Sequence, residues 1–506
     1  MTTVTTSKGI GLKSERGPVL AAIMLCTGLV ALDSTIIATA VPSVVSDLGG
    51  FAQFPWLFSI YLLTQAVTVP LYGKFADIFG RKPVMFFGIA VFLLGSVLCG
   101  VAWNMPALIF FRALQGIGAG AVQPMSITMV GDLYSVEERA RVQGYVASVW
   151  GVAAVIGPTL GGLFSEYISW RWIFFINLPL GAIAAWMLAR RFKERVTRSS
   201  HKIDYLGATL LTAGSSLIIL ALLEGGVAWS WASAPSLGIF AAGGVLLVAF
   251  VLVERRAVEP ILPLWVFRRR VLVGGNLVGL SVGALMIGLT SYVPTFAEGV
   301  LGTGALVAGF ALAALTIGWP LAATFSGRVY MRIGFRDTAL IGAAVVLAGA
   351  VMCALLGRHA QVWQVAAACF VVGVGLGLSS SPTMVAIQSV VGWDRRGVVT
   401  ATNMFSRSIG SAVGAAVLGA ISNATLSDRF THPPAALAGK LPSSLDATSL
   451  VLGAQGASTR SATATYVRDA LYDASHHVFL TVLAVAVLSV GAFLLMPRKT
   501  EQLTFD

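Results

Sequence analysis

Charged residues are scarce in this chain of 506 residues. Asp, Glu, Lys and Arg make up only 11% of it, whereas a soluble globular protein carries about 25%. Hydrophobic residues make up 57%. Repeated apolar stretches of about 20 residues, each long enough to cross a bilayer, explain both values. The composition therefore predicts an all-α integral membrane protein embedded in a lipid bilayer.

Patterns that bind metals or nucleotides are missing as well. The sequence has no CxxC or HExxH spacing and no GxxxxGK[ST] phosphate loop. Its five histidines are scattered or lie near segment ends, and its four cysteines all fall within apolar segments, at Cys26, Cys99, Cys353 and Cys369. We therefore expect no metal, no cofactor and no enzymatic activity. Without a phosphate loop, any energy that the protein uses should come from an ion gradient or from the gradient of a solute that it moves, and not from ATP.

The net charge of +12 does not indicate a nucleic-acid partner, because the basic residues lie in short loops between apolar runs. Three of them, Lys8, Lys13 and Arg16, precede the first apolar run, which is the charge order of a signal peptide. This run is too long for a signal sequence and contains Asp33. We therefore predict that it is the first membrane helix and is not cleaved.

Fourteen apolar segments predict fourteen membrane helices, and an even number places both termini on one side. With the N-terminus inside, inner segments hold 26 Lys and Arg, outer loops hold 6, and Arg112 and Arg407 lie within helices. This bias predicts a protein of the cytoplasmic membrane with both termini in the cytoplasm. The predicted spans are 18–40, 54–73, 83–103, 106–130, 142–165, 170–190, 205–223, 236–254, 272–297, 305–329, 337–356, 361–382, 396–422 and 475–496. An external loop, 423–474, could be an ordered hairpin or a flexible cover.

An internal repeat divides the chain. The run GKFADIFGRK at residues 73–82 returns in part as GRVYMRIGFR at residues 327–336, and both copies keep two glycines seven residues apart. Two further groups of glycines repeat at nearly the same offset in the sequence. This offset is longer than six helices and their loops would need, and the excess corresponds to two helices. We therefore predict a plan of six, two inserted and six helices, as in transporters built from repeats. The predicted parts are a tail (1–17), an N-terminal bundle (18–204), two inserted helices (205–254) and a C-terminal bundle (255–506).

Several motifs resemble those of the major facilitator superfamily, and the match covers nearly the whole chain. The loop at residues 73–82, RALQGIG at 112–118 and GVAAVIGPTLGG at 151–162 resemble its loop, fourth-helix and antiporter motifs. Three further runs resemble motifs of its fourteen-helix drug:proton antiporter branch, of the EmrB/QacA type. They are LDSTII at 32–37, AVP at 40–42 and WRWIFFINLPLG at 170–181. One departure is visible, because Met331 stands where the first loop copy has Asp77.

The resemblance implies a monomeric efflux transporter that exchanges protons for amphiphilic or cationic small molecules, including antibiotics, by alternating access. An alternative is the export of one specific metabolite, such as a siderophore, a lipid, an amino acid or a self-made antibiotic. A membrane sensor that uses the fold without transport is the second alternative.

The first loop is the expected conformational switch. Gly73 allows close packing at a helix end, and Gly80 permits a tight turn. Asp77 and Arg81 lie four residues apart and can pair on a helical turn. Asp77 could also lie near the positive end of a facing helix. A solvated loop that follows the positive-inside rule would explain the basic residues but not the paired glycines.

Asp33 is the strongest candidate for proton coupling, because it lies in the middle of the first apolar run. A charge at the bilayer centre costs about 2.5–3.5 kcal/mol on insertion scales, so it should face an internal cavity. Arg112, on the fourth helix, shares its depth and could tune its proton affinity. The alternatives are a structural hydrogen bond for Asp33 and backbone or glutamine contacts for Arg112.

Two further groups complete the candidate residues. Small residues along the fifth helix, with a proline that can kink it, could form a hinge between the halves or merely pack tightly; they are Gly151, Gly157, Pro158, Gly161 and Gly162. Gln65, Asn403 and Arg407 could line a substrate cavity. The sequence leaves open whether Arg407 contacts an anionic group or pairs with a carboxylate.

Overall fold

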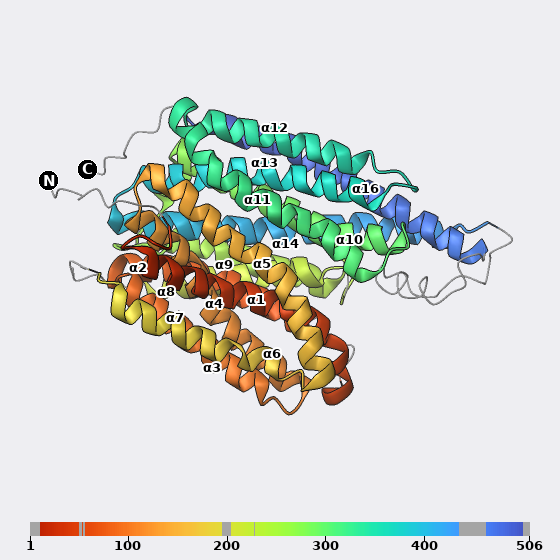
Figure 1. Cartoon of the computed structure of the whole chain (residues 1–506), viewed down its shortest axis with the longest axis horizontal. Coiled ribbons are helices and arrows are strands. Elements are labelled where there is room, and N and C mark those ends of the chain that lie inside the picture. Colours follow the sequence, from red (N-terminus) through yellow and green to blue (C-terminus); the bar gives the residue numbers. More distant parts are fainter. Residues whose placement is uncertain are drawn as a thin grey trace.

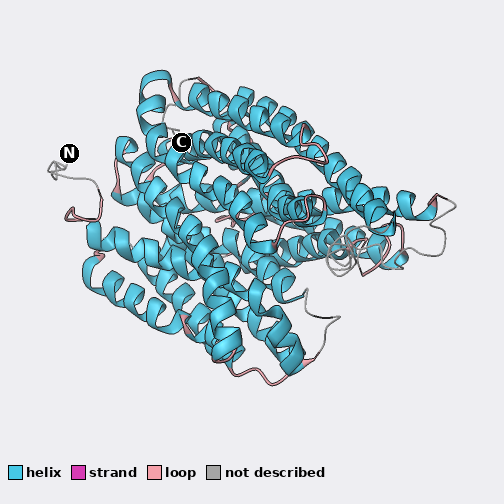
Figure 2. Cartoon of the chain, turned by 45° about the vertical axis from the view of Figure 1, so that its right-hand side comes forward, coloured by secondary structure: helices cyan, strands magenta, loops and turns pink. Residues whose placement is uncertain are grey.

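The computed structural model describes residues 11–49, 53, 56–194, 204–226, 228–434 and 462–498. Within these ranges the chain is helical, with one isolated β-bridge between Gly225 and Trp229 and no strand (Figure 2). The predicted all-α fold class is therefore confirmed.

The helices follow one another in two long groups with a short pair between them (Figure 1). The first group comprises α1 (Gly17–Leu48), α2 (Trp56–Phe79), α3 (Arg81–Gly100), α4 (Met105–Leu133), α5 (Val136–Tyr167), α6 (Trp172–Phe175) and α7 (Asn177–Arg191). The pair is α8 (Tyr205–Glu224) and α9 (Ala234–Glu254). After the 3-10 helix η2 (Leu264–Phe267) come α10 (Arg270–Gly299), α11 (Ala305–Ile333), α12 (Phe335–Ala354), α13 (Val362–Ser389), α14 (Trp393–Thr431) and α16 (Ala462–Leu495).

Thirteen spans in the described residues are long and apolar enough to cross a membrane. The remaining predicted span is α2, which has 24 residues but carries polar side chains such as Thr64, Gln65 and Lys74 along its length. The predicted span 170–190 is divided into α6 and α7. Pro179 has no backbone N–H to donate to the carbonyl of Phe175, so a continuous helix loses a hydrogen bond at this point.

The two groups pack in the same pattern, which is what an internal repeat requires. In the first, α1 packs on α5 while α3 and α2 pack on α4; in the second, α10 packs on α14 while α12 and α11 pack on α13. The halves meet where α5 packs on α11 and α2 packs on α14 (Figure 1). The α8–α9 pair lies against α2 and α14, beside this boundary.

Each half has its own apolar core. Ile23, Phe92 and Met125 are fully buried in the first half, and Leu289 and Phe479 in the second. Several polar contacts cross the boundary between these cores, at the end where α14 begins.

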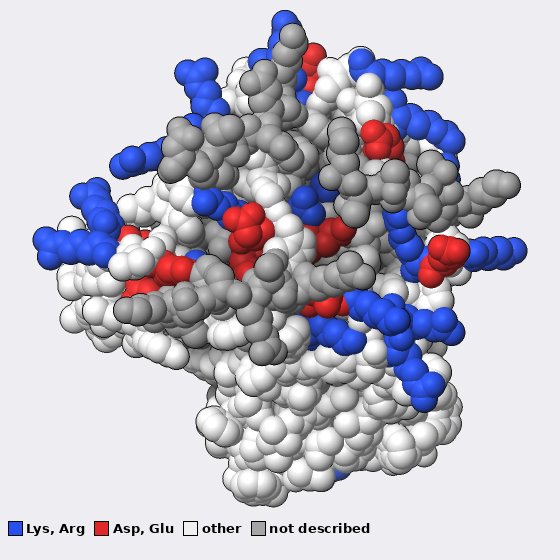
Figure 3. Space-filling view, turned by 90° about the vertical axis from the view of Figure 1, so that its left-hand side faces the viewer, with Lys and Arg blue, Asp and Glu red and all other residues white. Residues whose placement is uncertain are grey.

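The end of the bundle where α1 begins and α16 ends is called the basic end. Figure 3 shows this face, on which Lys and Arg side chains project around the rim and Asp and Glu lie nearer its middle. At the opposite end, two helices continue beyond the apolar spans predicted for them. There α14 extends to Thr431 and α16 begins at Ala462, so helix occupies both ends of the predicted loop 423–474, and residues 435–461 lie outside the described residues. Ion pairs such as Arg358–Asp469, at 3.0 Å, stabilise these extensions.

Candidate functional site

A buried ion pair joins α1 to α4 in the first half. The guanidinium of Arg112 (Nη1) lies 2.6 Å from Oδ2 of Asp33. Both side chains are about 1% exposed. The sequence placed these residues at one depth in separate helices, and the fold brings them into direct contact.

Polar side chains from neighbouring helices complete this cluster. Gln115, one turn after Arg112 on α4, donates to Oδ1 of Asp33 at 2.7 Å, and Asn177 of α7 donates to the same oxygen at 3.2 Å. Arg112 also donates to the backbone carbonyl of Leu57 at 3.2 Å, and its guanidinium carbon lies 4.2 Å from the centre of the Tyr61 ring. Both carboxylate oxygens and the guanidinium are thus engaged by protein groups.

The two buried charges of this cluster depend on each other. An isolated charge in the low-dielectric interior is costly, and the pair exists because each charge compensates the other. Loss of either charge would leave the other buried without a partner.

The α2–α3 turn reaches across to the second half. The carboxylate of Asp77 accepts hydrogen bonds from the backbone N–H groups of Gly397 and Val398, both at 2.8 Å, near the start of α14. This is the positive end of the α14 dipole. A Cβ atom at Gly73 would lie 2.3 Å from that of Ala401, so only glycine permits this approach of α2 to α14. Gly80 has φ = 97° and makes the turn between α2 and α3.

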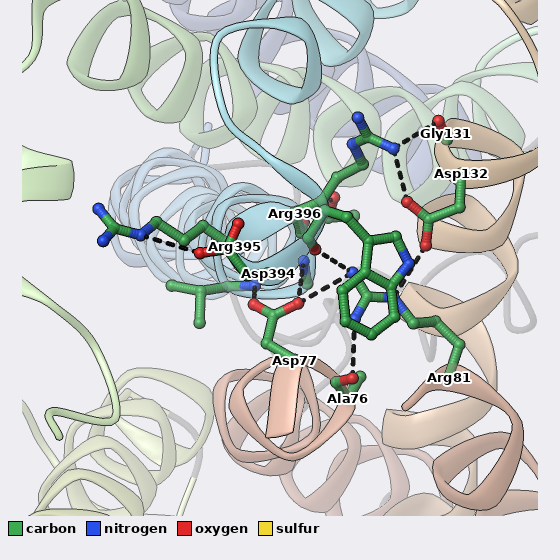
Figure 4. Close-up of polar contacts among 12 residues, drawn as sticks. Ala76, Asp77, Arg81, Gly131, Asp132, Asp394, Arg395 and Arg396 are labelled. Carbon is green, nitrogen blue, oxygen red and sulfur yellow. Dashed lines mark hydrogen bonds and ion pairs between the residues drawn. The ribbon is translucent and has the colours of Figure 1, made fainter. Parts of the chain in front are cut away.

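Arg81 also joins the α2–α3 turn to the start of α14 (Figure 4). Its guanidinium lies 3.1 Å from Asp77 and 2.8 Å from Asp132 of α4, and it donates to the backbone carbonyl of Trp393. The guanidinium carbon lies 3.8 Å from the centre of the Trp393 ring. Arg396 of α14 also pairs with Asp132, at 2.6 Å. We call Asp77, Arg81, Asp132, Trp393 and Arg396 the latch.

Two carboxylates from the segments that flank the α8–α9 pair support the α2–α3 turn. Glu194 accepts hydrogen bonds from the backbone N–H groups of Arg81 and Lys82, at 2.7 and 2.8 Å, and so caps the start of α3. Glu259 lies after α9 and pairs with Lys74 at 3.1 Å. The turn that carries the latch is therefore held by the chain before α8 and by the chain after α9.

The glycine-rich helix α5 packs between the halves. Cβ atoms at Gly157 and Gly161 would lie 2.1 and 2.2 Å from the hydroxyl oxygens of Thr35 and Thr39 on α1. A Cβ at Gly151 would lie 3.0 Å from a carbonyl of α11, whereas one at Gly162 would meet nothing within 4 Å. Pro158 lies inside the continuous helix, and its carbonyl accepts a hydrogen bond from Thr39 at 3.3 Å.

The three residues expected in a substrate cavity have different surroundings. Gln65 of α2 is half-buried and donates to Gln123 of α4 at 2.9 Å. Asn403 is buried and donates to the carbonyl of Gly275 on α10 at 2.6 Å. Arg407 is half-buried near the middle of α14.

Sequence reasoning missed several members of these clusters. Glutamine contacts to Arg112 were one of the alternatives, and Arg112 donates to Gln115 at 2.6 Å, but Gln115 itself was not named as a member of the cluster. Asn177 is a polar residue within an apolar run, and that signal could have found it. Asp132, Arg396 and Glu194 gave no such signal, because each is an ordinary charged residue at the end of a helix until the fold brings it to the latch.

Comparison with known proteins shows the family of this chain. The profile of the Major Facilitator Superfamily matches residues 23–415. The chain belongs to the Major Facilitator Superfamily. It is accordingly a multi-pass membrane transporter of small molecules, not an enzyme.

Two relatives and one solved structure match this chain over most of its length. A multidrug transporter of Bacillus subtilis, MdtP, is 35% identical over 83% of this chain and 78% of its own length. Multidrug resistance protein 3 of the same organism is 32% identical over 94% of both chains. The human organic anion transporter MFSD10 is 13% identical, with a TM-score of 0.64 over 95% of this chain and 99% of its own, and supports the fold alone.

Proposed function

We propose that this transporter is a proton-coupled antiporter that exports amphiphilic or cationic compounds by alternating access. The buried Asp33–Arg112 pair carries the proposal, because a membrane-embedded carboxylate with a matched cation is the minimum part for reversible proton binding. The relatives named for multidrug transport and resistance support export as the direction. The motifs at residues 32–37 and 170–181 support the fourteen-helix antiporter branch.

In the proposed cycle, a proton that reaches Asp33 weakens its bond to Arg112 and frees α1 to move relative to α4. Because α1 packs on α5, and α5 packs on α11, this movement reaches the boundary between the halves. Release of the proton restores the ion pair. Substrate and proton then bind alternately, as antiport requires.

The latch sets which state is favoured. In the structure it joins α2, α3 and α4 to α14 at the basic end, which we propose faces the cytoplasm because Lys and Arg gather there. Breaking the latch lets the two halves separate on that side of a cytoplasmic membrane. The protein works as a monomer in this scheme, because one chain contains both halves.

The experiment is efflux of a cationic dye from reconstituted vesicles, with and without an imposed pH gradient. The variants are Asp33→Asn and, as a control, Asp47→Asn, which changes an exposed aspartate at the C-terminal end of the same helix. We expect gradient-driven efflux in the wild type and in the control, and its loss in Asp33→Asn. Gradient-driven efflux that survives in Asp33→Asn would move the coupling site elsewhere.

Export of one specific metabolite is the second candidate. Proton-linked flux of a single compound, without flux of any cationic dye, would favour it. Absence of all flux, together with an Asp33→Asn variant that behaves as the wild type, would favour a membrane sensor.

A further inference from the structure

Arg407 is a second cationic side chain at membrane depth, and its surroundings differ from those of Arg112. It lies 15th of the 39 residues of α14 and is half-buried. Among the described residues, no carboxylate pairs with its guanidinium and no acceptor receives a hydrogen bond from it. Asp33, the carboxylate in the middle of α1, already pairs with Arg112.

The backbone around Arg407 is fixed against α10. One turn before it, Asn403 donates to the carbonyl of Gly275, and one turn after it, Ser411 donates to the carbonyl of Gly283 at 3.2 Å. A Cβ atom at Gly283 would lie 2.0 Å from the carbonyl oxygen of Arg407. Gly283 of α10 therefore packs directly against the backbone of Arg407.

Polar side chains of α2 and α4 lie at a similar depth in the first half. Apolar contacts between α2 and α14 bring Leu63 to Ala412 and Val69 to Met404, so Gln65 lies at the depth of Arg407. Gln65 and Gln123 form a half-buried hydrogen-bonded pair at that level. The exposed valines of α14, Val413 and Val417, lie roughly 100° around the helix from Arg407. Arg407 itself is half-buried, so it does not lie on the fully exposed face of α14.

We propose that Arg407 binds an anionic oxygen group of the exported compound. A charged side chain within a membrane is costly and is compensated by a partner. A guanidinium offers paired donors that fit the oxygens of a carboxylate, sulfonate or phosphate. This inference rests on the proposed export function and adds acidic and zwitterionic amphiphiles to its substrates.

The test is equilibrium binding to the full chain in nanodiscs, read as energy transfer from tryptophan to a dansyl group. Three probes share one dansyl-labelled undecyl chain and end in a sulfonate, a neutral sulfonamide or a quaternary ammonium group. The variants are Arg407→Gln, Arg407→Lys and a control, Arg332→Gln, which removes an exposed charge at the end of α11. Thermal unfolding of each variant verifies folding, and Arg407→Lys serves if Arg407→Gln does not fold.

We expect Arg407→Gln to weaken sulfonate binding by about tenfold or more, the loss of one charge-assisted hydrogen bond. Sulfonamide binding should not change, quaternary ammonium binding should not weaken, Arg407→Lys should lie between wild type and Arg407→Gln, and Arg332→Gln should match wild type. Equal weakening of all three probes, no change in any, or no wild-type preference for the sulfonate over the sulfonamide would overturn the assignment.

Binding also separates this inference from the export function. If the sulfonate preference depends on Arg407 but reconstituted vesicles export no probe, the anion site stands and the export function fails. If a pH gradient drives export of the quaternary ammonium probe and Arg407→Gln leaves sulfonate binding unchanged, export stands and the anion site fails.

Discussion

The two halves of this transporter make the same contact with different chemistry. In the first half, Arg81 donates to the carbonyl of Trp393 at the start of α14. In the second half, Tyr330 donates to the carbonyl of Val136, the corresponding first residue of α5. Asp77 is buried against α14, whereas its repeat counterpart Met331 is 50% exposed.

The difference assigns separate roles to the two contacts. Charges that are buried with a partner are strongly bound together but costly to leave alone, so a network of them favours two discrete states. The contact of the second half consists of the Tyr330 hydroxyl and the packed rings of Tyr330 and Phe335, whose centres are 4.9 Å apart. The energy of these neutral contacts changes little when the helices slide past each other. The α2–α14 contact therefore suits a switch, and the α5–α11 contact suits a pivot.

The largest expected effect comes from the buried pair itself. Arg112→Ala leaves Asp33 as an uncompensated buried charge, which should lower the free energy of unfolding by about 3–5 kcal/mol. Chemical unfolding of the protein in detergent measures the loss. The repeat counterpart of Arg112 is Cys369, and Cys369→Ala should cost much less. Combining Arg112→Ala with Asp33→Asn should recover part of the loss, and a strictly additive result would contradict the pairing.

A smaller effect is expected from the latch. Asp77→Asn weakens two hydrogen bonds to α14 and the ion pair to Arg81, so gradient-driven efflux should fall by about tenfold, the equivalent of 1.4 kcal/mol. The matched change in the second half, Met331→Asn, should leave the efflux rate as in the wild type. Equal losses in both variants would remove the asymmetry between the halves.

A smaller effect still is expected at Glu194, which caps α3 and so positions Arg81. Glu194→Gln keeps one acceptor oxygen but loses its charge, and the cap should weaken by about 0.5–1 kcal/mol. Efflux should fall about two- to fivefold. An efflux rate unchanged in Glu194→Gln would show that the latch does not depend on this support.

The smallest effect is expected at Tyr330. Tyr330→Phe removes one hydrogen bond to Val136, with an expected loss of stability of about 1 kcal/mol or less, and keeps the ring contact with Phe335. Efflux should stay within about twofold of the wild type. A loss as large as that of Asp77→Asn would contradict the role of a pivot.

Much of the fold could be predicted from the sequence, because membrane helices are recognisable by their length and apolarity. The repeat of Gly73 and Gly80 at Gly327 and Gly334 indicates two matching halves from sequence spacing alone. Helix ends were less accurate: α14 and α16 continue past the apolar segments, where ion pairs such as Arg429–Asp473 support them instead of the bilayer.

The candidate site could be predicted only where one segment carries the signal. Asp33 and Arg112 were visible as charges within apolar runs, and their contact followed from equal depth. Asp132 and Trp393 could not be found, because their role depends on a crossing between α4, α3 and α14 that has no local pattern. That Arg407 has no ion-pair partner among the described residues also depends on the fold, since the packing of α14 against α2 and α10 decides which side chains can reach it.

The most direct test of the switch is the distance between the halves at the basic end. Spin labels at Arg191→Cys on α7 and Arg332→Cys on α11 report this distance, and the four native cysteines are buried away from the labelling reagent. In nanodiscs, Asp77→Asn should move a large share of the population to longer distances, and Tyr330→Phe should match the unsubstituted protein. If both variants keep the distances of the unsubstituted protein, or both shift them equally, the first half does not hold the switch.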